Sequence, residues 1–173
     1  MIRRSIITFL IITISFVLQT SLIGAINPAS ANPNLMLIVT VTFALLRGDR
    51  TGIVTGFFCG LLTDVFFGNM IGFYALLYMI TGFYCARYHR KFYPENLVLP
   101  FSVITVADFF CGVACYLFLF ATRARYHVLF YLTRIILPEA VFTLIAAFLL
   151  YPVILKINTW LEDIEQRSAR KFV

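Results

Sequence analysis

Charged residues are scarce in this chain of 173 residues: 13% are charged, whereas 61% are hydrophobic. Soluble domains carry about 25% charged and about 45–50% apolar residues. A soluble core of this size could not bury so much apolar surface, because too few polar residues would be left to face water. The composition therefore excludes a soluble enzyme, a disordered chain and a disulfide-stabilised secreted module, and it predicts a protein that lies mostly in lipid.

Catalytic motifs are missing as well. The sequence contains no G-x-S-x-G, no H-E-x-x-H and no phosphate-binding glycine loop followed by Lys and Ser or Thr. Its two histidines, His89 and His127, fall in loops predicted on opposite sides of the membrane. We therefore predict no catalytic residues, no metal ligands and no cofactor. The four cysteines lie in predicted spans and are typical of small packing residues: Cys59, Cys85, Cys111 and Cys115.

What the chain has in abundance is long apolar stretches. Six of them cover residues 5–26, 34–46, 51–68, 71–86, 97–121 and 128–155. A membrane-spanning helix needs about 20 mostly apolar residues, and the second and fourth stretches are short by this measure. We predict an all-α, polytopic integral membrane protein with about six transmembrane helices. The alternative is four to five full crossings with one re-entrant segment.

The basic residues indicate the orientation. A net charge of +6 could also suit a nucleic-acid-binding protein, but Lys and Arg also collect at the cytoplasmic ends of membrane helices. With both termini in the cytoplasm, 11 of the 14 basic residues lie on the inner side: Arg3, Arg4, Arg47, Arg50, Arg87, Arg90, Lys91, Lys156, Arg167, Arg170 and Lys171. We therefore predict a cytoplasmic-membrane protein of this orientation that does not bind nucleic acid.

The chain is predicted to form one transmembrane domain, residues 1–156, followed by a cytoplasmic tail, residues 157–173. Trp160, Leu161 and Ile164 have helical spacing in the tail. This spacing favours either a short amphipathic helix at the membrane surface or an extension of the sixth span. Pro138 and Pro152 predict bends in that span. The first apolar stretch is longer than the hydrophobic region of a signal peptide, so we expect a retained helix.

Small residues recur every four positions in and after the third span. The series is Gly52, Gly56, Gly60, Asp64, Gly68 and Gly72. Positions i and i+4 share one helix face, and small residues there let two helices approach closely in lipid. The ridge could receive a helix of another protein, or it could pack within the bundle.

Four ionisable residues lie at predicted membrane depth: Asp64, Asp108, Arg134 and Glu139. Such residues are costly in hydrocarbon and usually face the interior of a bundle. Asp64 and Arg134 are both expected nearer the outer side, so we predict that they pair. Asp108 and Glu139 are expected near the midplane, with at least one of them neutral because burial disfavours the charged form. The network is either structural or part of a proton or cation path.

The order of these motifs resembles the MreD family of bacterial rod shape-determining membrane proteins. The resemblance begins with a basic pair before a span that ends in Leu-Gln-Thr-Ser, residues 18–21. It continues with Asn-Pro-Asn-Leu at 32–35, Arg47-Gly48, and then Gly52-x-x-x-Gly56-Phe-x-x-Gly60-Leu-x-x-Asp64. Gly68-x-x-x-Gly72 and an aromatic fourth span with Gly82 follow. The likeness covers residues 3 to about 93 well.

The resemblance implies a non-enzymatic component of the cell-elongation machinery that supports lateral peptidoglycan synthesis. Its implied partner is MreC, and through MreC the glycosyltransferase RodA, a class B penicillin-binding protein and MreB. The implied fold is similar to the S-components of energy-coupling-factor transporters, with six helices around a cavity. Whether two copies pair is left open. The positions implied for a partner or cavity surface are Pro33, Asn34, Gly52, Gly56, Gly60, Asp64, Gly68 and Gly72.

A solute-binding transporter subunit of similar architecture is the alternative. In such a protein the four intramembrane ionisable residues would line a ligand pocket. The first span has no Ala-x-x-x-Ala-type contact for a coupling subunit, which weighs against this alternative.

Overall fold

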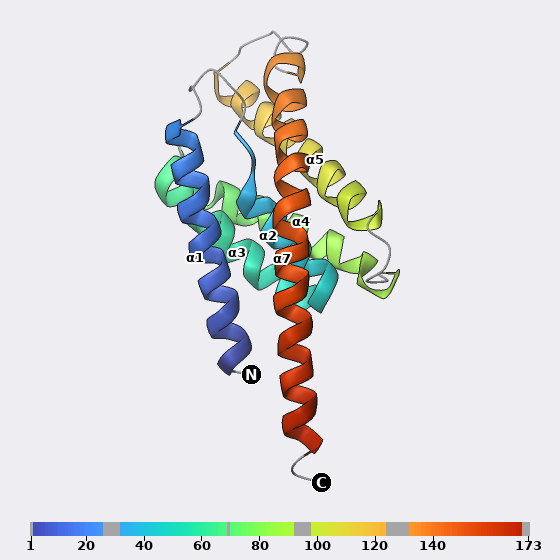
Figure 1. The fold of residues 1–173 in the computed structure, drawn as a ribbon. Coiled ribbons are helices and arrows are strands. Elements are labelled where there is room, and N and C mark those ends of the chain that lie inside the picture. Colours follow the sequence, from blue (N-terminus) through green and yellow to red (C-terminus); the bar gives the residue numbers. More distant parts are fainter. Residues whose placement is uncertain (1, 26–31, 69, 92–97, 124–131, 171–173) are drawn as a thin grey trace.

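The described part of the chain is entirely helical. The computed structural model describes residues 2–25, 32–68, 70–91, 98–123 and 132–170. Within these residues there are six α-helices, one 3-10 helix, one π-helix and no strand (Figure 1). The elements are α1 (Ile2–Ala25), α2 (Leu35–Arg47), α3 (Asp49–Phe67), α4 (Phe73–Ala86), η1 (Arg87–Lys91), α5 (Val98–Arg123), η2 (Leu132–Ile136) and α7 (Leu137–Arg170).

The prediction of an all-α membrane protein is confirmed, whereas the number of crossings is still a prediction. Four helical segments are long and apolar enough to cross a membrane: α1, α3, α5, and η2 together with α7. The helices α2 and α4 have 13 and 14 residues, which is shorter than the about 20 residues of a full crossing. The first turn of α1 and the last part of α7 lie at the same end of the bundle (Figure 1).

Helix α2 is the centre of the fold. Every residue from Leu35 to Leu45 is buried, and α2 contacts α1, α3, α4, α5 and α7. A helix that is apolar on all sides is suited to burial on all sides. The surrounding helices expose large apolar side chains, among them Phe9, Phe66, Val106 and Leu149, and these are suited to face lipid. The core therefore forms around the shortest α-helix of the described chain.

Helices α3 and α4 pack closely in antiparallel directions. Gly52 lies against the backbone of Gly82, Gly56 against Tyr78, and Gly60 against Tyr74. A Cβ atom at Gly56 or Gly60 would overlap the carbonyl group of its neighbour in α4. Helix α4 therefore occupies the glycine face of α3 in the structure, which favours packing within the bundle over docking of a foreign helix at these three positions.

The last helix runs beyond the predicted span. Pro138 is the second residue of α7, and the π-helix η2 ends two residues before it, so the irregularity expected near Pro138 lies in the preceding turn. Pro152 lies inside α7, which continues to Arg170. Between the two alternatives for the tail, the described residues therefore form an extension of the sixth span. Leu161 in this extension is buried, and Trp160 is exposed.

The α3–α4 contact predicts the effect of substitutions at its glycines. Gly60→Ala should lower the free energy of unfolding by at least about 2 kcal/mol, because the new methyl group meets backbone atoms that cannot move aside. The measurement is thermal unfolding of the purified protein in detergent.

Gly112→Ala is the matched control for Gly60→Ala. Its Cβ would lie 3.2 Å from side-chain atoms of Ile136, which can adjust. Alanine also gains about 1 kcal/mol of helix propensity over glycine, so this variant should be nearly neutral. Equal unfolding temperatures for the two variants would contradict the proposed role of Gly60.

Candidate functional site

Asn34 joins three helices at the start of α2. Its Oδ1 atom accepts hydrogen bonds from the backbone N–H of Leu37 (3.2 Å) and from the Tyr78 hydroxyl of α4 (2.8 Å). Its own backbone N–H donates to Oγ1 of Thr143 in α7 (3.1 Å). An asparagine at this position caps the helix by satisfying one of its unpaired N–H groups. The neighbouring Pro33 is buried, so the Pro33-Asn34 motif fixes where α2 begins.

Asp64 holds the start of α4. Its carboxylate accepts hydrogen bonds from the backbone N–H groups of Gly72 (3.0 Å), Tyr74 (2.9 Å) and Ala75 (2.9 Å). The N-terminus of a helix presents unpaired N–H groups and a partial positive charge, which a buried carboxylate satisfies. Gly72 precedes α4 with a φ of 103°, a left-handed conformation that favours glycine.

The expected ion pair between Asp64 and Arg134 is therefore wrong. The Asp64 carboxylate is bound by the first residues of α4, and Arg134 is exposed on η2. Among the described residues, the one ion pair is that between Arg4 and Glu165. Backbone N–H groups at the start of α4 bind the carboxylate in place of the basic side chain that we expected. A sequence pattern does not show where such groups will lie.

Asp108 and Glu139 lie near each other in the structure. Asp108 of α5 is buried, and Thr143 and Glu139 of α7 are close enough to interact with its carboxyl group. Because Thr143 also accepts the N–H of Asn34, a polar chain connects α5, α7 and the start of α2. No described His, Cys, Asp or Glu residues form a group of three that could hold a metal ion. The neutrality of one carboxyl stays a prediction.

A second polar cluster lies at the other end of α2. Nε of Arg47 donates to Oδ1 of Asn158 (2.7 Å), and Nη1 donates to Oγ1 of Thr8 (2.8 Å). The guanidinium carbon lies 4.8 Å from the centre of the Phe43 ring. Burial lowers the pKa of Arg47 and the charge of Arg4 lowers it further, whereas Glu162 and Glu165 raise it.

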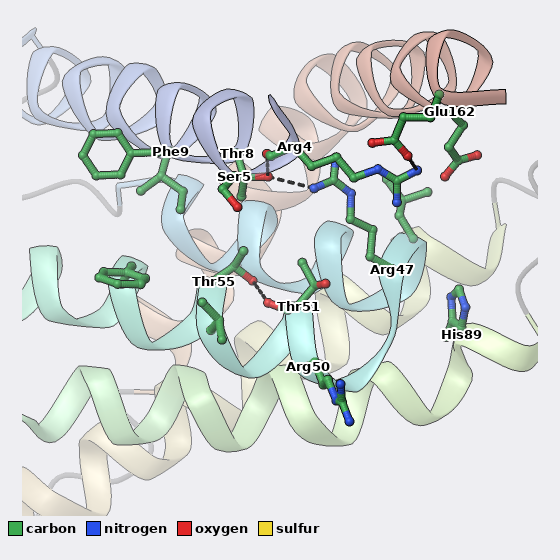
Figure 2. Close-up of a pocket in the computed structure, with 15 residues that line it drawn as sticks. Arg4, Ser5, Thr8, Phe9, Arg47, Arg50, Thr51, Thr55, His89 and Glu162 are labelled. Carbon is green, nitrogen blue, oxygen red and sulfur yellow. Dashed lines mark hydrogen bonds and ion pairs between the residues drawn. The ribbon is translucent and has the colours of Figure 1, made fainter. Parts of the chain in front are cut away.

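A pocket of about 1130 Å³ surrounds this cluster. Figure 2 shows side chains of α1, α2, α3 and α7 converging on it. Its lining residues are Arg4, Ser5, Thr8, Phe9, Ile12, Leu46, Arg47, Arg50, Thr51, Val54, Thr55, Phe58, His89, Glu162 and Glu165. At its rim, Nδ1 of His89 lies 2.6 Å from the carbonyl oxygen of Leu45, so this nitrogen carries the hydrogen and donates it.

Two arginines that line the pocket have buried nitrogen atoms without hydrogen-bond partners among the described residues. These atoms are Nη2 of Arg47 and Nε of Arg4. A buried donor left unsatisfied costs about 1–3 kcal/mol. The sequence predicted no such cluster, although Thr8 and Asn158 are polar residues in largely apolar surroundings, and Arg47 ends an apolar stretch.

The sequence of the chain matches one known protein family. The family model described as rod shape-determining protein MreD matches residues 2–159. The chain belongs to the MreD family. The match extends the resemblance, which rested on residues 3 to about 93, across α5 and most of α7. As an MreD-family member, this chain is a multi-pass, rod shape-determining membrane protein. No curated protein sequence and no solved structure matches it, so the likeness to transporter S-components stays a prediction.

In this MreD-family chain, the eight motif positions do not form one surface. Asn34 caps α2, Asp64 binds the start of α4, and Gly52, Gly56 and Gly60 are buried between helices. Gly72 is exposed in the α3–α4 turn and Gly68, at its other end, is partly exposed. Most of the motif therefore fixes the bundle, and the turn is the part of it that faces outward.

Asp64 should be essential for stability. Asp64→Ala leaves three N–H groups at the start of α4 without an acceptor, so we expect unfolding to become easier by at least about 3 kcal/mol. Asp64→Asn keeps one acceptor oxygen, so its stability should lie between that of the wild type and that of Asp64→Ala. Thermal unfolding in detergent measures both. Asp49→Asn, at an exposed residue in the first turn of α3, is the control, and an Asp64→Ala protein as stable as this control would refute the capping role.

Arg47 and Glu165 should differ in their contribution to stability. Arg47→Leu removes hydrogen bonds to α1 and α7 and leaves Oδ1 of Asn158 without this donor. We therefore expect the free energy of unfolding to fall by at least about 2 kcal/mol. Glu165→Gln removes a partly exposed ion pair and should cost no more than about 1 kcal/mol. Unfolding temperatures measured at low and high salt test this order. A larger loss for Glu165→Gln would contradict it.

Proposed function

We propose that this chain is a non-catalytic scaffold of the rod complex that binds MreC and supports lateral peptidoglycan synthesis and rod shape. The observation that carries the proposal is the family match over residues 2–159. Through MreC, the chain would be connected to RodA, a class B penicillin-binding protein and MreB. The family match does not favour the alternative of a solute-binding transporter subunit.

The structural roles of the motif residues support a scaffold function. Asn34 and Asp64 cap helices, and Gly56 and Gly60 allow two helices to touch. Each of these roles fixes the position of one helix relative to another, and none of them leaves a reactive group facing a substrate. A rigid bundle of this kind can present a constant surface to a bitopic partner.

The positions of the basic residues support an orientation with both ends in the cytoplasm. Arg4 lines the same pocket as Arg47 and Arg50, although it is more than forty residues away from them in the sequence. Lys and Arg collect on the cytoplasmic side of membrane proteins. Asp64 lies near the opposite end of α3 from Arg50, so the α3–α4 turn would lie toward the outer side.

We place the contact with MreC at this α3–α4 turn. Met70 and Ile71 in the turn are exposed, Ile71 by 81%, and Phe66 beside them is also exposed. The Asp64 carboxylate accepts a hydrogen bond from the backbone N–H of Gly72, so the end of the turn is held at the start of α4. Contacts between well-ordered apolar side chains contribute most of the affinity of many interfaces.

Ile71→Glu should weaken MreC binding without unfolding the protein. We expect recovery of MreC with the tagged chain to fall at least about fivefold, which corresponds to about 1 kcal/mol. The matched control is Val98→Glu at the start of α5, where the side chain is 76% exposed. Co-purification from native membranes measures recovery, and restoration of rod shape in depleted cells measures function.

Three results would count against these proposals. Equal MreC recovery with Ile71→Glu and wild type would place the contact elsewhere on the bundle. Equal losses with Ile71→Glu and Val98→Glu would indicate a general effect of charge rather than a contact at the turn. Failure to recover MreC with the wild-type chain, together with normal rod shape after depletion, would overturn the scaffold function itself.

A further inference from the structure

The pocket around Arg47 is polar at one end and apolar at the other. Arg4, Arg47 and Glu162 line the polar end, whereas Phe9 and Phe58 line the apolar part. In Figure 2, Phe9 lies on the opposite side of the view from Arg47 and His89. The volume of the pocket, about 1130 Å³, is slightly above the about 300–1,000 Å³ that small-molecule pockets occupy.

The two ends of the pocket follow the depth of the membrane. Arg4 lies in the first turn of α1, and Phe9 follows more than one turn later. Arg50 lies in the first turn of α3, and Phe58 follows about two turns later. Phe9, Val54 and Phe58 are exposed, so the apolar part opens toward the lipid. The pocket therefore runs from headgroup level toward acyl-chain level.

The charges of the pocket favour an anion. Three arginines face two glutamates, and both glutamates are already engaged: Glu165 pairs with Arg4, and Glu162 accepts a hydrogen bond from Asn158. Arg47 makes hydrogen bonds only with the neutral side chains of Thr8 and Asn158, and its Nη2 atom has no partner among the described residues. Arg50 forms no ion pair with the part of the chain that the structure describes.

We propose that this pocket binds one anionic phospholipid. The phosphate group lies at the end of the pocket that Arg4 and Arg47 line, where their positive charges attract it, and an acyl chain lies along Phe9, Val54 and Phe58. Arg50 lines the edge of the pocket toward α4 (Figure 2) and adds positive charge there. Arginine forms strong hydrogen bonds with phosphate oxygens, and basic pockets between transmembrane helices bind lipid headgroups. The bound lipid joins α1, α3 and α7 where their own side chains leave a gap.

The test compares lipid binding by the purified full chain and its variants in detergent. The probes are phosphatidylglycerol, phosphatidylcholine with the same acyl chains, and inorganic phosphate, and retained lipid is counted by native mass spectrometry. We expect the wild-type chain to retain phosphatidylglycerol at least about tenfold better than phosphatidylcholine, and inorganic phosphate not to displace it.

Two pairs of matched variants locate the site and leave the hydrogen bonds of Arg47 to Thr8 and Asn158 intact. Arg50→Gln removes a charge from the pocket, and Arg87→Gln removes an exposed one outside it. Phe58→Ala shortens the apolar wall, and Phe57→Ala changes its equally exposed neighbour, which does not line the pocket. We expect Arg50→Gln and Phe58→Ala to weaken phosphatidylglycerol binding about fivefold and each control by less than twofold.

Several outcomes would overturn the proposal. Equal retention of the two lipids would show that the charge plays no part. Equal losses with Arg50→Gln and Arg87→Gln would indicate diffuse attraction of anionic lipid to a basic surface. Displacement of the lipid by inorganic phosphate at comparable concentration would show that the pocket recognises a free anion, and an unchanged affinity in Phe58→Ala would remove the acyl-chain contact.

Discussion

The complete burial of α2 is the constraint on which the rest of this structure depends. Helix α2 has 13 residues, and a buried helix cannot use water to satisfy the polar groups at its ends. At the start, Asn34 caps the helix and binds Tyr78 and Thr143. At the end, Arg47 and the ring of His89 extend the polar contacts to α1, α7 and η1. Polar side chains gather where α2 begins and ends, because the unpaired backbone groups at these two places need partners.

The pair formed by α3 and α4 solves a related problem without long side chains. Glycines at four-residue spacing bring the two backbones into contact, and dispersion forces between close surfaces replace the hydrophobic drive that is missing in lipid. Asp64 then anchors the start of α4. A short helix of 14 residues is thereby fixed in position, although it is not long enough to span a bilayer on its own.

These two features give the chain a rigid interior and different chemistry at its two ends. The turn after Asp64 presents apolar side chains, whereas the end near Arg47 presents a basic pocket with an apolar wall. A bundle whose polar groups are used to fix its helices is suited to the scaffold function that we propose for this chain. We infer that partner contact and lipid contact are separated along α3.

Sequence alone determined the class of the protein, the approximate extents of the helices and the family. Composition, the length of the apolar stretches and the glycine spacing depend only on local residues. Tertiary structure decided which groups meet. Asp64 binds amides of α4 and not Arg134, because backbone N–H groups become available only once a helix starts beside it. The Arg47 cluster joins Thr8 and Asn158 across more than a hundred residues, and no local pattern encodes such a contact.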